Sequence, residues 1–504
     1  METMLSRRAC LILPAAATLR GQRKPYPYRW VYVSRSLRED RHVEDIRRIA
    51  RTAGEHGLNG MVLSAGLDRL ELEPPDYFAR LEQVKDICRE HRLAIIPIIF
   101  SAGYGGSILA FNRNLAEGLP VKDALFVARG GEARLEADPP LARLEKSGGE
   151  VAVRPYRCYR VSARVKTEGL QPEGSLRVQV LAEDGRALAP LDLRVPSTTD
   201  WRKVVLGFNS LRYDRVRISA GARSGGSGRA WVEDLGIEEI GLVNVLRRPG
   251  TPVVVRSDRG DMTYQEGVDY APVADDSLTF RFDHDGPPIR LLPDSRIAEG
   301  QRLRVSYYHG ISINRGQVTV CMSEPEIYDI WRRQARRMHE VLRPEMYLLS
   351  MDEVRAGGTC QACQRSGLSM ARILGDCITR QVEILRGVNP DARVFVWSDM
   401  LDPNHNARGN YYLVEGDYTG SWKHVPKDLV IVCWYYNRRR DSLAHFSGLG
   451  FKTLAGAYYD GDTLDNPKGW LEALEATDGA CGIMYTTWQN KYELLAGFGD
   501  LVGG

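Results

Sequence analysis

Eight short apolar runs along the chain are each long enough for one β-strand, and amphipathic helical stretches separate most of them. The runs cover 30–34, 60–64, 93–100, 346–351, 394–397, 429–434, 453–458 and 482–485. Continuous apolar strands that alternate with helices indicate a parallel sheet covered on both faces. Eight such units are the number in a (β/α)₈ barrel, so we expect an α/β fold of the TIM-barrel type.

The helical stretches show the 3.6-residue apolar period. In the first of them Val43, Ile46, Ile49, Ala50 and Ala53 share one face, and Gly57 follows where a helix would end. An open, doubly wound sheet is the alternative. That fold usually has a glycine-rich phosphate turn after its first strand, whereas this chain has Val33-Ser34-Arg35-Ser36 there.

The barrel pattern breaks between the third and fourth strands. Residues 150–308 contain many short alternating strands separated by glycine-rich turns, which predicts an inserted β-sandwich and a second small β unit from about 252 to 308. The expected organisation is an export signal or tail at 1–24, the first part of the barrel at 25–149, this insert, and the second part of the barrel at 309–504. The insert resembles carbohydrate-binding modules in its aromatic residues, although most of them are expected in its core: Tyr156, Tyr159, Trp201 and Trp231.

Charge and hydropathy exclude two classes of protein. The net charge is +3, from 68 basic and 65 acidic residues in a chain of 504, which argues against a nucleic-acid binder with a concentrated basic face. No apolar run reaches the 18 residues of a membrane-spanning helix. Ser6-Arg7-Arg8 precedes a short apolar run at 9–19, which is typical of an export signal and resembles a twin-arginine signal. We therefore expect a secreted or periplasmic protein.

The nine cysteines are dispersed, and one pair, Cys360 and Cys363, forms a CxxC motif. A structural zinc site usually needs four ligands, and no second CxxC or HxxxH motif completes this one. The sequence therefore favours loop cysteines or one local disulfide, with no metal. No phosphate-binding loop is present either, so we expect no organic cofactor.

Acidic and aromatic residues gather where the predicted strands end, which is where barrel enzymes place their active sites. The residues at these ends are Arg35, Asp352-Glu353, Trp397-Ser398-Asp399, Trp434-Tyr435, Tyr459-Asp460, Tyr485 and Trp488. We expect a pocket in which aromatic rings surround a few carboxylates. Such a pocket would suit an oligosaccharide or polysaccharide substrate. His309, which follows the insert, is a further candidate if that segment enters the barrel at the same end.

Asp352 and Glu353 are adjacent, and both can reach the cavity where the chain turns at the strand end. Two like charges this close raise the pKa of one of them, which leaves a proton available near neutral pH. A general acid for a glycosidic oxygen needs such a proton. The pair is therefore the predicted catalytic centre.

These residues resemble glycoside hydrolase family 20. The chain has Glu324-Pro325-Glu326-Ile327-Tyr328 at the start of a helix that leads to a strand ending in Asp352-Glu353, as that family does. The resemblance implies a retaining, exo-acting β-N-acetylhexosaminidase, in which the 2-acetamido oxygen of the sugar is the nucleophile. It also implies roles for individual residues: Glu353 as acid and then base, Asp352 orienting the acetamide, Tyr435 or Tyr459 bonding its oxygen, Arg35 binding the sugar, and Trp397, Trp434 and Trp488 walling it.

The chain departs from the family pattern at three places. Ser350-Met351 stands where the family usually has two glycines, Ser64-Ala65-Gly66-Leu67-Asp68 replaces a histidine-containing loop, and Trp488-Gln489-Asn490 replaces Trp-x-Glu. The implied relationship is therefore distant.

Two other functions fit the same residues. In one, Glu353 is the acid and Asp399 or Asp460 attacks the anomeric carbon of a 2-hydroxy sugar, with the two carboxyl groups about 5–5.5 Å apart. In the other, the barrel binds carbohydrate without turning it over.

Overall fold

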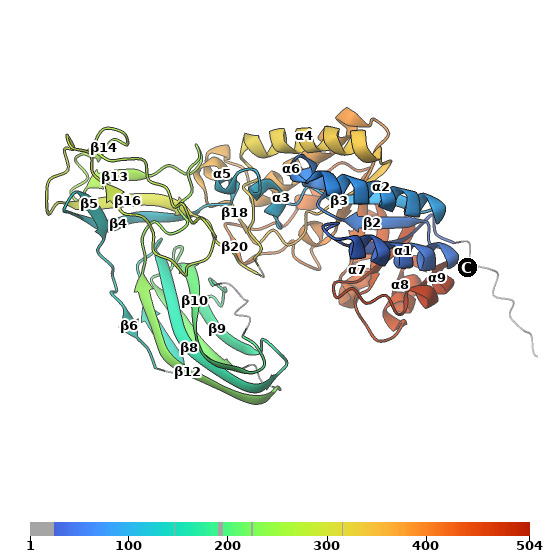
Figure 1. Cartoon of the computed structure of the whole chain (residues 1–504), viewed down its shortest axis with the longest axis horizontal. Helices are drawn as coiled ribbons and strands as arrows, with labels where there is room; N and C mark the ends of the chain where they lie inside the picture. Colours follow the sequence, from blue (N-terminus) through green and yellow to red (C-terminus); the bar gives the residue numbers. More distant parts are fainter. Residues whose placement is uncertain (1–24, 146, 190–194, 223–224, 315, 504) are drawn as a thin grey trace, which may run out of the picture.

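A closed barrel of eight parallel strands forms one half of the molecule. The computed structural model describes residues 25–145, 147–189, 195–222, 225–314 and 316–503 (Figure 1). The barrel strands, in order, are β1 (Tyr28–Ser34), β2 (Gly60–Ser64), β3 (Ala94–Ile99), β17 (Met346–Leu349), β19 (Arg393–Trp397), β21 (Val430–Cys433), β22 (Lys452–Tyr458) and β23 (Ala480–Thr486). Parallel pairing of β1 with β23 closes the ring. The predicted TIM-barrel fold is confirmed.

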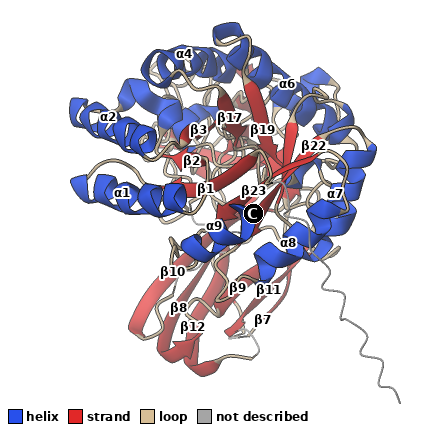
Figure 2. Ribbon diagram, turned by 90° about the vertical axis from the view of Figure 1, so that its right-hand side faces the viewer, coloured by secondary structure: helices blue, strands red, loops and turns tan. Residues whose placement is uncertain are grey.

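Helices surround the barrel, as Figure 2 shows in a view that has the strands in the middle. The longer ones are α1 (Asp40–Glu55), α2 (Pro75–Glu90), α4 (Pro325–Leu342), α6 (Met370–Val388), α7 (Arg439–Gly448), α8 (Asp465–Glu475) and α9 (Leu495–Gly503). Proline at the first position starts α2 and α4, where the missing amide hydrogen costs nothing. Helix α1 buries the apolar face that its sequence period predicts.

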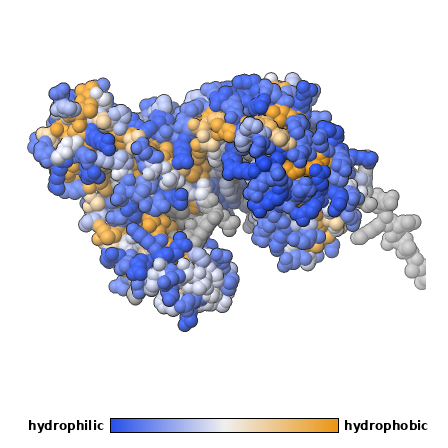
Figure 3. All heavy atoms as spheres, viewed as in Figure 1, coloured by the Kyte–Doolittle hydropathy of each residue, from blue (hydrophilic) through white to orange (hydrophobic). Residues whose placement is uncertain are grey.

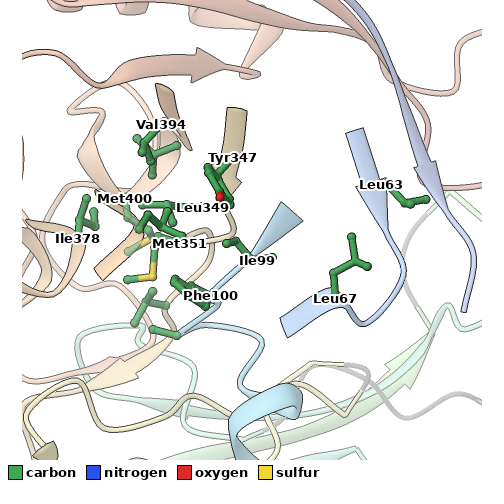
Figure 4. Close-up of a cluster of buried hydrophobic side chains, with 14 of the residues drawn as sticks. Leu63, Leu67, Ile99, Phe100, Tyr347, Leu349, Met351, Ile378, Val394 and Met400 are labelled. Carbon is green, nitrogen blue, oxygen red and sulfur yellow. The ribbon is translucent and has the colours of Figure 1, made fainter. Parts of the chain in front are cut away.

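Two layers of apolar side chains hold the barrel. The alternate residues of each strand point inward, where Trp30, Ile96, Leu348, Phe395 and Val432 fill the interior. The other residues point outward and pack against the helices. Figure 4 shows this outer layer around β2, β3 and β17, where Ile99, Phe100 and Leu349 lie close together and Leu63 lies apart from them, beyond Leu67. The strands therefore read as continuous apolar runs because both faces are buried.

The inserted β region leaves the barrel after β3 and returns before α4, as predicted. It lies beside the barrel, to the left in Figure 1. One part is a six-stranded sheet in the order β14-β13-β16-β4-β5-β15. The other part has two sheets with a shared core, β10-β8-β12-β6 and β7-β11-β9. The strands are β4 (Leu119–Arg129), β5 (Glu132–Leu135), β6 (Ala142–Arg143), β7 (Gly148–Ala152), β8 (Cys158–Gln171), β9 (Leu176–Ala182), β10 (Thr199–Asn209), β11 (Arg215–Ala222), β12 (Ser227–Glu239), β13 (Val254–Ser257), β14 (Thr263–Tyr264), β15 (Ile289–Arg290) and β16 (Arg302–His309).

The insert begins earlier than the sequence pattern placed it. The expected boundary lay between 149 and 150, but β4 pairs antiparallel with β16 and β5 pairs with β4. Both strands therefore belong to the inserted region, which starts at Leu119. The partner of β4 lies far along the chain, and a pairing of that kind leaves no local signal in the sequence.

The aromatic residues of the insert are not a free sugar-binding surface. Tyr159 is fully buried and stacks on Phe208, with 5.3 Å between ring centroids. Trp201 and Trp231 are half-buried, and the cationic groups of Arg164 and Lys166 lie over their rings. Lys122 covers Tyr156 in the same way.

The face of the molecule shown in Figure 3 is mainly hydrophilic over the barrel helices, with apolar residues in small patches. No helix in the described ranges is both long and apolar enough to cross a bilayer. The predicted export signal with Arg7-Arg8 lies outside the described residues.

Candidate active site

A pocket of about 750 Å³ opens at the carboxyl ends of the barrel strands. Its wall includes side chains from the ends of β1, β2, β3, β17, β19, β21, β22 and β23. The lining includes Tyr32, Ser64, Asp68, Ser101, Tyr104, Asp352, Glu353, Trp397, Trp434, Tyr459 and Trp488. The pocket is therefore at the end of the barrel where the sequence placed the catalytic pair.

Asp352 and Glu353 follow β17 and both line the pocket. The hydroxyl of Ser350 donates a hydrogen bond of 2.9 Å to Oδ1 of Asp352. Burial, with the charge of Glu353 as the second cause, raises the pKa of Asp352 to about 6. Asp352 is therefore mostly ionised at neutral pH and becomes protonated in mild acid.

Four side chains fix the carboxylate and the backbone of Glu353. Tyr104 donates its hydroxyl to Oε2, and Nη2 of the buried Arg355 lies 2.8 Å from Oε1. The backbone amide of Glu353 donates to Oδ2 of Asp399 at 2.9 Å, and its carbonyl accepts from Nε2 of Gln317 at 2.7 Å. Glu353 has a φ of +50°, an uncommon conformation for a residue with a side chain. Strained backbone held by several contacts is typical of functional sites.

Asp399 lies behind Glu353 and is fully buried. Burial first, and then the charge of Asp352, raise its pKa to about 8, so its carboxyl group carries a proton at neutral pH. Oδ2 also accepts a hydrogen bond from Asn406 at 2.8 Å, and Nε1 of Trp434 lies 3.4 Å from Oδ1. These contacts make Asp399 a support for Glu353 and Trp434 rather than a group that faces substrate.

Four aromatic rings form one side of the pocket. Trp434 and Tyr459 are stacked, with centroids 6.1 Å apart and planes 12° from parallel. Trp397 and Trp488 are tilted at 6.0 Å. Tyr459 and Trp488 are 46% and 44% exposed, far more than most large apolar side chains. The rings offer flat apolar surfaces for the C–H faces of a sugar.

Two predicted binding residues have other roles in the structure. Arg35 does not line the pocket: its Nε pairs with Asp45 at 3.1 Å and its Nη1 donates to Asn490. Asp460 accepts hydrogen bonds from the hydroxyl of Thr487 and from the backbone amide of Trp488, the latter at 2.9 Å. Asp460 therefore shapes the loop that carries Trp488.

Three further candidates also lie outside the pocket. Tyr435 stacks on His405 at 4.5 Å, so of the two predicted acetamide-binding tyrosines it is Tyr459 that lines the cavity. Tyr485 is fully buried and donates its hydroxyl to the carbonyl of Lys491 at 2.8 Å. His309 is fully buried in the insert, where its Nε2 lies 3.0 Å from Nδ2 of Asn209 and burial lowers its pKa to about 4. The expectation that His309 reaches the site was wrong, because β16 ends in its own sheet.

The sequence analysis missed Tyr104, Arg355 and Gln317. Tyr104 follows β3, so inspection of that strand end would have found it. Arg355 is two residues after Glu353, but its pairing depends on the shape of the turn. Gln317 lies in the segment that returns from the insert, and no sequence pattern connects it with β17.

Gly103 allows the loops after β3 and β17 to touch. A Cβ at this position would lie 2.1 Å from the carbonyl oxygen of Asp352 and 2.9 Å from that of Glu353. Only glycine permits this approach, which brings Tyr104 within reach of the Glu353 carboxylate.

Cys360 and Cys363 are not bonded to each other. Both thiols are free and buried, and a third buried cysteine, Cys321, lies 3.4 Å from the first and 3.6 Å from the second, measured between sulfur atoms. Both distances are longer than a disulfide bond, which is about 2.05 Å. Because Cys360 and Cys363 are themselves free thiols, the expected local disulfide between them is absent.

No family model matches the chain, and no curated protein matches it. Solved structures similar to it include the chitobiase of Flavobacterium johnsoniae, with a TM-score of 0.40 and 8% identity, covering 95% of this chain and 48% of that one. An exo β-N-acetylglucosaminidase of Vibrio harveyi has a TM-score of 0.39 and 9% identity, covering 95% of this chain and 54% of that one. The β-N-acetylhexosaminidase of Bacteroides fragilis has a TM-score of 0.39 and 8% identity, covering 95% of this chain and 64% of that one. Family 20 enzymes are thus among the solved structures that the chain is similar to. The chain spans about half to two thirds of their length.

Proposed function

We propose that this protein is a glycoside hydrolase that takes the terminal sugar of its substrate into the barrel pocket. The observation that carries the proposal is the placement of Asp352 and Glu353 in a pocket walled by Trp397, Trp434 and Trp488. A pocket of this volume is in the usual range for a small-molecule site. The proposal includes exo action, that is, cleavage from the end of a chain.

Within this proposal the substrate carries a 2-acetamido group and supplies its own nucleophile. The acetamido oxygen attacks the anomeric carbon while Glu353 donates a proton to the glycosidic oxygen, which leaves with the bonding electrons. Ionised Asp352 accepts the acetamide N–H and stabilises the positive charge of the cyclic intermediate. Tyr459 donates its hydroxyl to the acetamide oxygen. Glu353 then removes a proton from water, which opens the ring with overall retention of configuration.

The contacts of Glu353 suit this cycle. Once Glu353 has given up its proton, the carboxylate is stabilised by the Arg355 guanidinium and the Tyr104 hydroxyl, both of which already point at it. Preorganised donors of this kind cost no rearrangement during the reaction. The two carboxyl groups therefore lie in different surroundings. Asp352 is desolvated, whereas Glu353 is paired with Arg355 and Tyr104.

The alternative mechanism with a protein nucleophile has less support. Asp399 is fully buried and protonated at neutral pH, and Asp460 is committed to the backbone amide of Trp488 and to Thr487. Neither carboxylate faces the pocket. The catalytic pair likewise gives the binding-only alternative less support, because a binding site has no need of a desolvated carboxyl group.

A panel of aryl β-glycosides tests the proposal, with each 2-acetamido sugar paired with its 2-hydroxy counterpart. Activity should be confined to the acetamido sugars and should fall about 10²–10⁴-fold in Glu353→Gln. The matched control is Glu345→Gln, a surface carboxylate paired with Arg393 at the other end of β19. Turnover of the 2-hydroxy sugars would contradict substrate assistance, and sugar binding without turnover would contradict the hydrolase.

A further inference from the structure

Four buried ligand-bearing side chains meet where the insert joins the barrel. They are Glu117, Cys321, Cys360 and Cys363, whose ligand atoms all lie within 4.8 Å of one another. Glu117 and Cys363 are 3% exposed, and the other two are fully buried. The set is outside the proposed active site and has no part in the mechanism above.

We propose that these residues form a structural zinc site. Zinc prefers tetrahedral sites of cysteine sulfur, with histidine or carboxylate completing the set, and structural sites have all four positions filled by protein. Three thiolates and one carboxylate provide that number. A soft, thiolate-rich set favours zinc over calcium or magnesium, which prefer oxygen ligands.

The spacing of the ligand atoms fits a tetrahedron. With Zn–S bonds of about 2.3 Å, sulfur atoms in a tetrahedron are about 3.8 Å apart. Cys321 lies 3.4 and 3.6 Å from the sulfurs of Cys360 and Cys363. With a Zn–O bond of about 2.0 Å, oxygen and sulfur are about 3.5 Å apart. Oε2 of Glu117 lies 3.7 Å from the Cys363 sulfur.

The surroundings orient the carboxylate ligand. Oε1 of Glu117 accepts hydrogen bonds from the backbone amide of Cys360 at 3.1 Å and from the amide and hydroxyl of Thr359, both at 3.2 Å. These contacts leave Oε2 as the oxygen nearer to the Cys363 sulfur, at 3.7 Å against 3.9 Å for Oε1. Metal ligands are commonly held by a second layer of hydrogen bonds in this way.

A buried cation close to the cluster offsets part of its negative charge. Arg248, from the insert, is 8% exposed and pairs with Glu324. Its Nη2 also donates to the carbonyl of Ala116 at 2.9 Å, next to Glu117. Three thiolates and a carboxylate around a divalent ion leave an excess of two negative charges, so a neighbouring guanidinium favours metal binding.

The site would join three separate parts of the chain. Glu117 lies in the segment that leaves the barrel, and Cys321 lies in the segment that returns to it. The two segments form one antiparallel neck, with the amide of Glu117 2.7 Å from the carbonyl of Thr319 and the amide of Cys321 2.9 Å from that of Leu115. Cys360 and Cys363 come from the loop that follows Asp352 and Glu353.

Zinc would thereby hold the neck against the loop of the catalytic pair. The neck also supplies Gln317, which donates to the carbonyl of Glu353 and accepts from Arg355. A shift of the neck would move these contacts. The zinc site does not depend on the reaction proposed above, because metal content is measured without a substrate.

Metal analysis of the purified, tag-free full chain tests the site. We expect about one zinc ion per chain, with X-ray absorption showing three sulfur neighbours at about 2.3 Å and one oxygen at about 2.0 Å. The variant Cys321→Ser/Cys363→Ser should lose the zinc, and Cys88→Ala, a buried thiol beside Met61, should keep it. Release of zinc by a chelator should lower the melting temperature of the wild type, because metal binding contributes to folding.

The analysis of the wild type decides the matter if the double variant does not fold. A chain that holds less than about one tenth of an equivalent of zinc, even after exposure to zinc under reducing conditions, would overturn the proposal. The proposal would also be overturned if protein purified under reducing conditions contained a disulfide among Cys321, Cys360 and Cys363. Bound zinc with no sulfur neighbours would overturn it as well.

Discussion

Nη2 of Arg355 lies 2.8 Å from Oε1 of Glu353, and the guanidinium is 5% exposed whereas the carboxylate faces the pocket. The same guanidinium donates through Nη1 to Gln317, and its Cζ lies 5.1 Å from the centre of the Tyr412 ring. A buried cation fixed at several points holds the half-buried carboxylate in one orientation. The position of Glu353 therefore depends on a residue that does not line the pocket.

Arg355→Met should reduce both activity and stability. The change leaves the Glu353 carboxylate without its cation and Gln317 without its donor, so we expect the free energy of unfolding to fall by about 1–3 kcal/mol. Turnover number should fall more than tenfold, because the ionised acid loses its stabilising partner. Urea denaturation and steady-state kinetics measure the two effects. Arg372→Met, which breaks an exposed pair with Asp376, is the control. Unchanged turnover in Arg355→Met would contradict a role in catalysis.

Gly103→Ala should displace the catalytic turn. The new Cβ would overlap the carbonyl oxygen of Asp352, which is backbone and cannot rotate away. We expect a loss of about 1–3 kcal/mol in stability and a fall in turnover of at least tenfold. Gly387→Ala is the matched control, since its Cβ would meet nothing within 4 Å and alanine favours the helix. Normal activity in Gly103→Ala would show that the two loops separate without cost.

The barrel could be predicted from the sequence because its signal is local. Each strand is a continuous apolar run, and each helix such as α1 shows its buried face in its own residues. Because the strand signals are local, the sequence also predicted that Asp352, Glu353 and the tryptophans lie at strand ends. The start of the insert could not be predicted, because β4 pairs with β16 across most of the inserted region.

The roles of the remaining site residues could not be predicted from the sequence, because they depend on side-chain partners elsewhere in the chain. Arg35 and Asp460 stand at strand ends as predicted, but Asp45 on α1 and the turn after β23 occupy their polar atoms. The CxxC motif has two further neighbours, Glu117 and Cys321, that no short spacing reveals. Such clusters depend on how distant segments pack, which a linear pattern does not contain.

The pH dependence of kcat/KM should show an acid limb near pH 6. The pKa of Asp352 is raised to about 6 by burial and by the Glu353 charge, and the proposed mechanism needs Asp352 ionised. Activity should therefore fall as pH drops through 6. Asp352→Asn should be less active and should lose this limb, whereas Asp428→Asn, at a surface pair with Arg386, should keep it. An unchanged limb in Asp352→Asn would assign the titration to another group.

Trp488→Ala should weaken substrate binding more than it slows the reaction. Its ring is 44% exposed at the pocket, and covering one face of such a ring contributes about 1–2 kcal/mol, so KM should rise about tenfold. The loop should stay in place, because Asp460 bonds to the Trp488 backbone rather than to its side chain. Trp488→Phe should recover much of the affinity. A selective loss of turnover number, with unchanged KM, would contradict a role as a binding platform.

Asp399→Asn should alter how stability depends on pH. In the folded protein the pKa of Asp399 is about 8, against about 4 in an unfolded chain. The folded state therefore binds this proton more tightly, so the stability that it contributes is complete below pH 4 and is lost as pH rises toward 8. Asparagine cannot ionise and keeps an oxygen for the Glu353 amide. The wild type should therefore lose stability from pH 5 to pH 8 relative to the variant. The urea midpoint of the variant, minus that of the wild type, should increase over this range. A difference that is the same at both pH values would mean that Asp399 is ionised throughout, and the protonated support behind Glu353 would have to be abandoned.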